Sequence, residues 1–114
     1  MWDEFTEFRE PTAPELRLLE ALFRKCADSP SGWLARLRVS PMLDGHMGSL
    51  RLRLAGEDEG SATFWRRGAE LQFTDSDGVE VIASLNLDTH GKPFELDIWK
   101  TNFAPLVQIP ERLV

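Results

Sequence analysis

The sequence contains few of the residues that form disulfides or bind metals. Its 114 residues include one cysteine, Cys26, and two histidines, His46 and His90. One cysteine cannot form an intramolecular disulfide, which favours a reducing compartment. A structural zinc site needs four Cys or His ligands and a catalytic zinc site needs three, so the sequence predicts no metal and no cofactor.

Long apolar runs and clusters of basic residues are also missing. No stretch of about eighteen apolar residues is present, and residues 1–5 are acidic where a signal peptide would be basic. We therefore expect a cytoplasmic protein that has no membrane partner. No run of Lys and Arg exceeds two residues, and the formal net charge is −6. Because Lys and Arg supply much of the affinity for phosphates, we expect no nucleic-acid partner.

The negative charge is concentrated in the second half of the chain. Residues 1–57 carry eight basic and nine acidic side chains, a net charge of −1, whereas residues 58–114 carry five and ten, a net charge of −5. This charge either keeps the protein in solution or attracts a basic protein partner. The length and the hydrophobic content of 42% predict a single domain over residues 1–114.

A helix is predicted over residues 12–28. Thr12 and Glu15 have the spacing of a capping box, and Pro14 lies in the first turn, where its missing N–H costs little. Apolar residues then recur at intervals of three and four, at Leu16, Leu19, Leu22, Phe23 and Cys26. Pro30 disfavours helical geometry at the residue before it, so the helix should end near residue 28.

From residue 33 onward the apolar period changes from 3.6 to 2, which indicates strands. The predicted strands cover residues 33–39, 50–55, 62–65, 69–73, 79–87 and 94–99. Connections this short favour antiparallel neighbours in sequence order. The predicted fold class is therefore α+β, with one N-terminal amphipathic helix packed on a curved antiparallel meander sheet of about five or six strands.

Both ends of the chain carry apolar residues outside these elements. Residues 1–11 have three aromatic side chains at intervals of three, Trp2, Phe5 and Phe8, and are expected to form a short arm. Residues 103–114 contain Leu106, Val107 and Ile109. They predict an additional edge strand that ends at Pro110, so the strand-rich part covers residues 33–109.

The segment Met42–Ser49 combines Asp44, His46, two glycines and a hydroxyl group between two predicted strands. It has neither the spacing of a dinucleotide-binding loop nor the lysine of a P-loop. Two interpretations remain open. The segment is a turn in which Asp44 accepts hydrogen bonds from nearby backbone N–H groups, or Asp44 and His46 form a binding site.

Glu95, Asp97 and Trp99 share one face of the last predicted strand. In a cleft, the two carboxylates could raise each other's pKa and act as acid and base. On an outer face, they would pair with arginines of neighbouring strands, at positions 36, 38, 51 and 53. Together with Trp99 they would then form a protein-binding surface.

Four segments occur in an order that resembles known proteins. They are Arg9–Thr12, Met42–Leu50, Leu85–Asp88 and Phe94–Leu106. Together they resemble a family of small uncharacterised bacterial proteins, a domain of unknown function, over most of residues 9–110. The resemblance implies a bacterial cytoplasmic protein and supplies no catalytic residue. The family has a small residue at the position of His46. The resemblance therefore implies no role for the His46 imidazole that other family members share.

The leading functional hypothesis from the sequence is a non-enzymatic protein-binding module, for example an immunity-type protein that neutralises a basic toxin. Two alternatives remain. One is a small enzyme or ligand-binding protein that uses Asp44 and His46, or Glu95 and Asp97, in a cleft. The other is a homodimer joined through an edge strand or the C-terminal segment.

Overall fold

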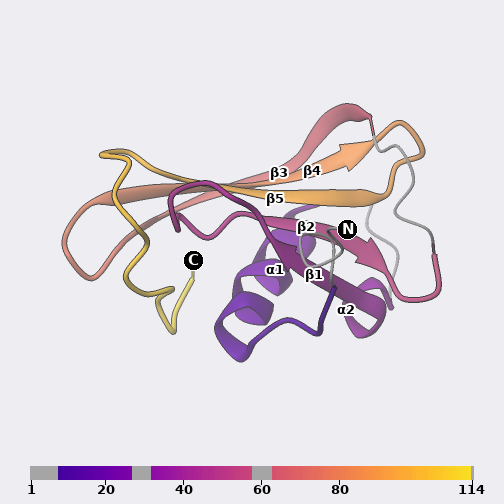
Figure 1. The fold of residues 1–114 in the computed structure, drawn as a ribbon, viewed down its shortest axis with the longest axis horizontal. Helices are drawn as coiled ribbons and strands as arrows, with labels where there is room; N and C mark the ends of the chain where they lie inside the picture. The colour runs from indigo at the N-terminus through magenta and orange to yellow at the C-terminus, as the bar shows by residue number, and fades with distance from the viewer. Residues whose placement is uncertain (1–7, 27–31, 58–62, 114) are drawn as a thin grey trace.

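The computed structural model describes residues 8–26, 32–57 and 63–113. Its elements are α1 (Ala13–Lys25), α2 (Trp33–Arg36), β1 (Leu37–Pro41), β2 (Leu50–Leu54), β3 (Phe64–Thr74), β4 (Glu80–Asp88) and β5 (Pro93–Lys100). All neighbouring strands are antiparallel, in the order β1-β2-β5-β4-β3. The predicted fold class, a helix packed on an antiparallel sheet, is confirmed (Figure 1).

The strand order differs from the predicted meander at one place. β3, β4 and β5 form a meander, but β2 pairs with β5 instead of β3, with Leu50 opposite Leu96. To reach the far edge of the sheet, the chain after β2 must pass two strands and reach a third, roughly 14 Å. Residues 55–63 connect β2 to β3, and nine residues span up to about 30 Å. The connection therefore allows both orders.

Local signals predicted the start of α1 correctly. The Thr12 hydroxyl accepts a hydrogen bond from Glu15 N at 3.3 Å, and Thr12 N donates to Glu15 Oε1 at 2.8 Å. These two bonds form the predicted capping box. The helix ends at Lys25, because the backbone of the next residue, Cys26, is extended. The Cys26 N–H still donates to the carbonyls of Leu22 and Phe23 in the last turn. The predicted last turn at residues 27 and 28 lies outside the described residues.

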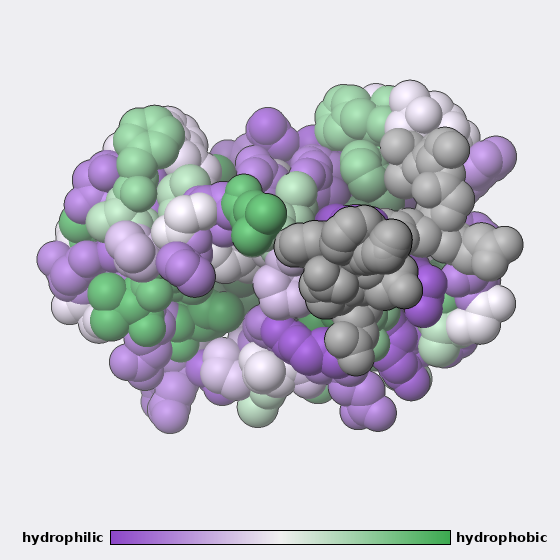
Figure 2. Space-filling model, in the orientation of Figure 1, coloured by the Kyte–Doolittle hydropathy of each residue, from purple (hydrophilic) through white to green (hydrophobic). Residues whose placement is uncertain are grey.

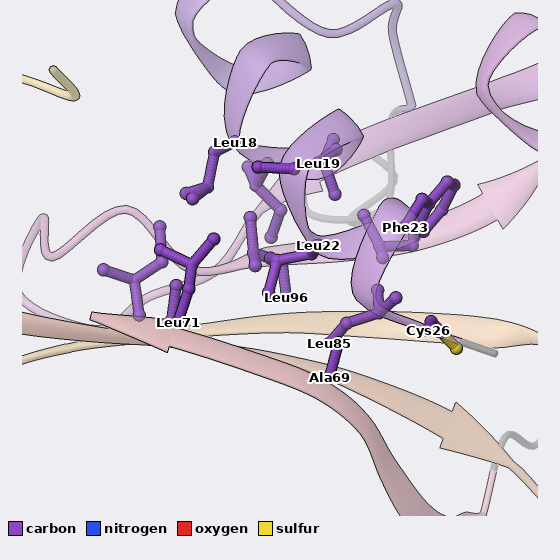
Figure 3. Close-up of a cluster of buried hydrophobic side chains, with 14 of the residues drawn as sticks. Leu18, Leu19, Leu22, Phe23, Cys26, Ala69, Leu71, Leu85 and Leu96 are labelled. Atoms are coloured by element: carbon purple, nitrogen blue, oxygen red, sulfur yellow. The ribbon is translucent and has the colours of Figure 1, made fainter. Parts of the chain in front are cut away.

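The core lies between α1 and one face of the sheet, which we call the inner face. Figure 3 shows helix side chains that point toward strand side chains, namely Leu18, Leu19 and Leu22 toward Leu71, Leu85 and Leu96. All of these leucines are buried. Full burial of one leucine contributes about 1.5–3 kcal/mol. Neither α1 nor α2 covers the opposite side of the sheet, which we call the outer face (Figure 1).

Two strand predictions were wrong in detail. Residues 33–36 form the short helix α2 instead of the start of a strand. Gly32 has a left-handed backbone with φ 94°, and the rings of Trp33 and Phe23 pack edge to face at 5.8 Å. Residues 64–74 form one strand instead of two, because β3 continues through residues 66–68, between the two predicted strands, with register shifts between Phe64 and Arg66 and between Arg67 and Ala69. Residue 62, part of the first of these predicted strands, lies outside the described residues.

The C-terminal tail, residues 101–113, forms no edge strand. It is held instead by side chains of other elements, and Ile109 is buried in the core. Arg17 of α1 donates from Nη2 to the carbonyls of Ile109 and Pro110 at 3.2 and 3.4 Å. The Leu106 N–H donates to the carbonyl of His46 at 3.0 Å. Most of the predicted arm, residues 1–11, lies outside the described residues. In the described part of the arm, Arg9 pairs with Val39 of β1.

None of the helices in the described ranges is both long and apolar enough to cross a membrane.

Candidate functional site

The strand register places an aromatic and acidic surface on the outer face of the sheet. Trp99 of β5 lies opposite Ile82 of β4. In the next row, Asp97 lies opposite Ser84, which lies opposite Glu70 of β3. Directly opposed residues on neighbouring strands share a face. We call the surface of Glu70, Ile82, Asp97, Trp99 and Phe103 the Trp99 face.

Two aromatic rings form the apolar part of the Trp99 face. Trp99 is 40% exposed and Phe103 is 69% exposed. Their ring centroids lie 6.2 Å apart, with an angle of 53° between the ring planes. Figure 2 shows apolar surface at the left of the view, where the chain leaves β5. Two large rings in contact with each other and with solvent are typical of a surface that binds a partner.

Phe103 has an unusual backbone. Its φ is 63°, in the left-handed region that a bulky side chain rarely adopts. Its N–H donates to the Lys100 carbonyl at 2.8 Å, and the Asn102 side chain accepts from Ala104 N at 3.0 Å. Such a backbone costs about 1–3 kcal/mol. Glycine would adopt this turn with less strain, so the turn holds a phenylalanine at a cost to stability.

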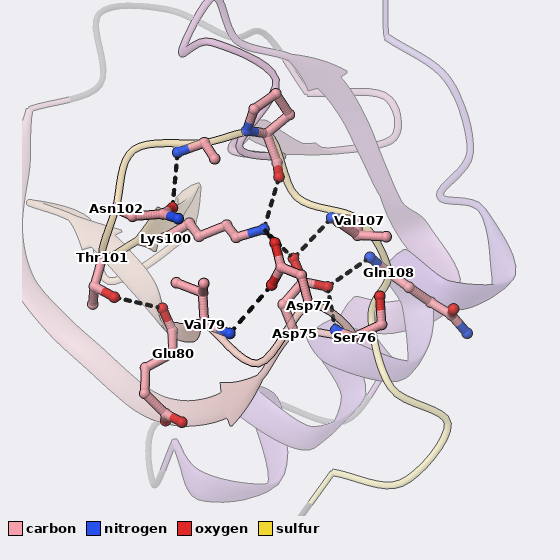
Figure 4. A network of polar contacts seen from close by, with 12 residues as sticks. Asp75, Ser76, Asp77, Val79, Glu80, Lys100, Thr101, Asn102, Val107 and Gln108 are labelled. Carbon is pink, nitrogen blue, oxygen red and sulfur yellow. Dashed lines mark hydrogen bonds and ion pairs between the residues drawn. The ribbon is translucent and has the colours of Figure 1, made fainter.

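A buried ion pair fixes the start of this turn. Lys100, the last residue of β5, is fully buried, and its Nζ lies 2.8 Å from Asp75 Oδ2. The same Nζ lies 2.5 Å from Asp77 Oδ2 and donates to the Pro105 carbonyl at 3.0 Å. Figure 4 shows these contacts between the β3–β4 hairpin and the tail. Three acceptors therefore compensate the buried ammonium.

Asp75 connects the hairpin to the tail. Its carboxylate accepts hydrogen bonds from the N–H groups of Val107, Gln108 and Ser76 at 2.8, 3.0 and 2.7 Å. Burial raises the pKa of Asp75, but the Lys100 ammonium and these N–H groups outweigh it and lower the pKa to about 2. Burial likewise lowers the pKa of Lys100, and the two carboxylates outweigh it and raise that pKa. Both charges are therefore retained at neutral pH.

The predicted carboxylates Glu95 and Asp97 lie on the outer face. Glu95 is half-buried, and its Oε1 accepts from Asn86 Nδ2 at 2.8 Å. Asp97 is exposed, and within the described residues its carboxylate accepts no hydrogen bond. The predicted pairing with arginines is observed in the register for Arg51, which lies opposite Glu95.

The other three arginines have different contacts. Arg36 bonds Glu57 at 3.1 Å, Arg38 donates to its neighbouring Leu37 carbonyl, and Arg53 lies over the ring of Phe8. The same ring lies 5.8 Å from the Arg51 guanidinium. These guanidinium groups thus contact residues from different parts of the chain. The alternation of residues along a strand does not predict such contacts.

The Met42–Ser49 segment borders a small hollow of about 180 Å³ against the first turn of α1. Asp44 and His46 both line it, together with Glu15. Asp44 Oδ2 accepts from Ser49 N at 2.9 Å, as the turn interpretation predicted. Asp44 Oδ1 is buried and has no partner among the described residues. His46 is exposed and has a left-handed φ of 64°.

The structure thus divides the five predicted site residues into two places. Asp44 and His46 line the hollow, whereas Glu95, Asp97 and Trp99 lie on the outer face. Within the described ranges, no group of three or more His, Cys, Asp or Glu side chains has the arrangement of a metal site.

Sequence reasoning missed Phe103, Asp75 and Lys100. Lys100 had a usable signal, because its position in the alternation places it on the inner face with Leu96 and Ile98. A lysine on an apolar face requires an anionic partner. Asp75 and Phe103 had no comparable signal, because their roles depend on the position of the tail.

Comparison with known proteins identifies the family and no individual relative. Neither a curated protein nor a solved structure matches the chain. A family model with the description "Domain of unknown function" (DUF6984) matches residues 8–110, which include α1, all five strands and most of the tail. This match confirms the resemblance predicted from the sequence. The chain therefore belongs to the DUF6984 family.

Proposed function

We propose that this protein is a non-enzymatic protein-binding module. Its Trp99 face binds a partner segment that combines apolar and basic side chains. The observation that carries the proposal is Phe103, whose ring is held against Trp99 and 69% exposed by a left-handed backbone. Strained residues with exposed side chains are concentrated at functional sites.

The two rings have the properties of binding hot spots. Trp and aromatic neighbours contribute much of the affinity at protein interfaces when a partner covers them. Trp99 and Phe103 already contact each other, so binding needs to order few additional rotamers. Ile82 lies beside Trp99 in the same row and is half-buried, which extends the apolar surface onto β4.

The charge around the rings favours a basic partner. Asp97 presents a carboxylate with no hydrogen-bond donor in the described part of the chain. Glu70 lies in the same row as Asp97, and its Oε1 forms an ion pair with Arg67 Nη1 at 2.6 Å. The second half of the chain has a net charge of −5. Acidic groups beside an apolar centre increase the association rate and the selectivity for basic segments.

A random-peptide display library tests this proposal without a known partner. We expect the wild-type protein to select peptides that combine Lys or Arg with aromatic or aliphatic residues. The double variant Trp99→Ala, Phe103→Ala should lose binding to the selected peptides. The matched control is Phe64→Ala. This variant removes an exposed ring at the start of β3, outside the Trp99 face, and should bind the selected peptides normally.

Two results would contradict the proposal. One is a set of selected peptides that bind the double variant as tightly as the wild type. The other is a dimer in light scattering that the double variant abolishes, because the occupant of the Trp99 face would then be a second copy of the chain. Asp97→Asn separates charge from shape, and should weaken peptides rich in Lys and Arg more than purely apolar ones.

A further inference from the structure

We propose that the partner segment of the Trp99 face is an amphipathic α-helix, which lies on the outer face of the sheet with its apolar and basic side chains toward β5. This inference rests on the proposed function and adds the conformation and the side-chain spacing of the partner. It follows from the central position of β5, from the two edges of the sheet and from the spacing of the groups on the Trp99 face.

The position of Trp99 excludes a partner that adds a strand beside it. β5 lies between β2 and β4, and Trp99 is paired with Ile82 of β4. On the other side the pairing with β2 ends at Leu96. Beyond it, the Ile98 N–H donates to the Ser49 hydroxyl at 2.9 Å and the Ile98 carbonyl accepts from that hydroxyl at 3.3 Å. Strand addition needs an unpaired edge, so the partner must contact the side chains of β5 and not its main chain.

The two edges of the described sheet are also poor places for an added strand. β1 forms one edge, and its Val39 already exchanges two backbone hydrogen bonds with Arg9, at 2.8 and 2.9 Å. β3 forms the other edge, and two register shifts interrupt it between residues 64 and 69. Irregularities of this kind protect edge strands against pairing. A strand added to β3 would lie three strand spacings from β5, roughly 14 Å, too far to cover Trp99.

The outer face suits a helix better than an extended chain. A helix satisfies its own backbone, whereas an extended chain laid across a sheet face would bury unpaired N–H and C=O groups. Neither α1 nor α2 covers this face (Figure 1). Over β2, the Arg53 guanidinium already lies against the Phe8 ring, 4.4 Å from its centroid. Among the described residues, the part of the face left to a partner therefore lies over β3, β4 and β5.

The spacing of the groups on the Trp99 face matches one turn of helix. Trp99 and Asp97 are two residues apart on one strand, which places them about 6.6 Å apart. Residues four apart on a helix are separated by a rise of about 6 Å and point to the same side. The ring centroid of Phe103 lies 6.2 Å from that of Trp99. The expected helix therefore carries two apolar residues one turn apart and a Lys or Arg one turn from one of them.

Two patterned peptide libraries test the conformation of the partner. One varies apolar and basic residues at intervals of three and four in a frame rich in Ala and Gln, and the other varies them at alternate positions in a frame rich in Thr. Both are selected against the whole wild-type chain. We expect the helical library to supply binders at least about ten-fold tighter than the alternating library. These binders should gain helical circular dichroism when they bind, because short helices are only marginally stable alone.

The position of the basic residue is tested on the tightest helical binder. Moving its Lys or Arg by two positions turns the charge to the opposite side of the helix and keeps the composition. We expect this change to weaken binding to the wild type by about two- to five-fold, and to have little effect on binding to Asp97→Asn. The double variant Trp99→Ala, Phe103→Ala should lose the binder, whereas Phe64→Ala should keep it.

Four results would overturn the inference. They are tighter binders from the alternating library, bound peptides without helical circular dichroism, unchanged wild-type binding after the charge is moved, and peptides from the fully random library that need Trp99 and Phe103 when neither patterned library supplies such a binder. In each case the proposed function still stands. Protein binding by the Trp99 face fails instead if no library supplies a peptide that depends on the two rings, or if a dimer lost in the double variant shows that a second copy covers them.

Discussion

The Lys100 ammonium and the Asp75 carboxylate lie 2.8 Å apart, and both side chains are fully excluded from solvent. The pair joins the end of β5 to the β3–β4 hairpin, and through the Val107 and Gln108 N–H groups it also holds the tail. One contact thereby fixes three parts of the chain, including the turn that presents Phe103.

Removal of Asp75 should strongly destabilise the protein. Asp75→Ala leaves the Lys100 ammonium buried without its main partner, and loss of one member of a buried ion pair costs about 3–5 kcal/mol. Urea unfolding measures this loss, and hydrogen exchange should show reduced protection at Val107 and Gln108. Lys92→Met removes an exposed ion pair with Glu57 and is the matched control. A stability of Asp75→Ala equal to that of this control would contradict the prediction.

The same pair predicts a dependence of stability on acid. The pKa of Asp75 is lowered from 3.8 to about 2 on folding. Its contribution is therefore fully present above about pH 4 and is lost as the pH falls through 2. Asp77 and Glu15, whose pKa values are also lowered, act in the same direction. We expect the stability of Asp75→Asn to fall less steeply between pH 4 and 2 than that of the wild type, and parallel curves would refute this assignment.

Gly68 should be needed for the contact between α1 and β3. A Cβ at this position would lie 2.9 Å from Cys26 Sγ and 3.1 Å from the Leu87 side chain. We expect Gly68→Ala to lower the free energy of unfolding by about 1–3 kcal/mol. Cys26→Ala removes the closest atom, so a double-mutant cycle in urea should show that the two substitutions compensate in part. Strict additivity would show that the steric explanation is wrong.

Phe103 should show a conflict between stability and binding. Asparagine tolerates the left-handed backbone better than phenylalanine does. Phe103→Asn should raise the free energy of unfolding by about 0.5–1 kcal/mol while it weakens binding of the selected peptides. Thermal unfolding and peptide titration measure the two effects on one sample. A variant that is less stable and binds normally would leave the ring without the proposed role.

The parts of the fold that were predicted correctly depend on local chemistry. The capping box of Thr12 and Glu15 is complete within four residues, and the alternation in β4 and β5 is read directly from the sequence. Residues 33–36 were misassigned because one turn of helix also places Trp33 inward. Alternation over so few positions does not distinguish a short helix from a strand.

The site was only partly predictable for a related reason. Trp99, Asp97 and Glu95 were placed on one face correctly, because a period of two is sufficient for that inference. The contact of Phe103 with Trp99 depends on how the tail turns after Lys100, and that turn is fixed by Asp75 of a distant hairpin. The hollow likewise requires α1 and the Met42–Ser49 segment to meet. Pairings between distant segments leave little signal in a single sequence.

The position of β5 has a consequence for synthesis on the ribosome. β5 is the last strand to be made, yet it lies at the centre of the sheet, between β2 and β4. The β1–β2 and β3–β4 hairpins therefore have no strand to join them until residues 93–100 have left the exit tunnel. Until then each hairpin presents an unpaired edge, which other chains can bind. Completion of the sheet is therefore delayed until all five of these strands have been made.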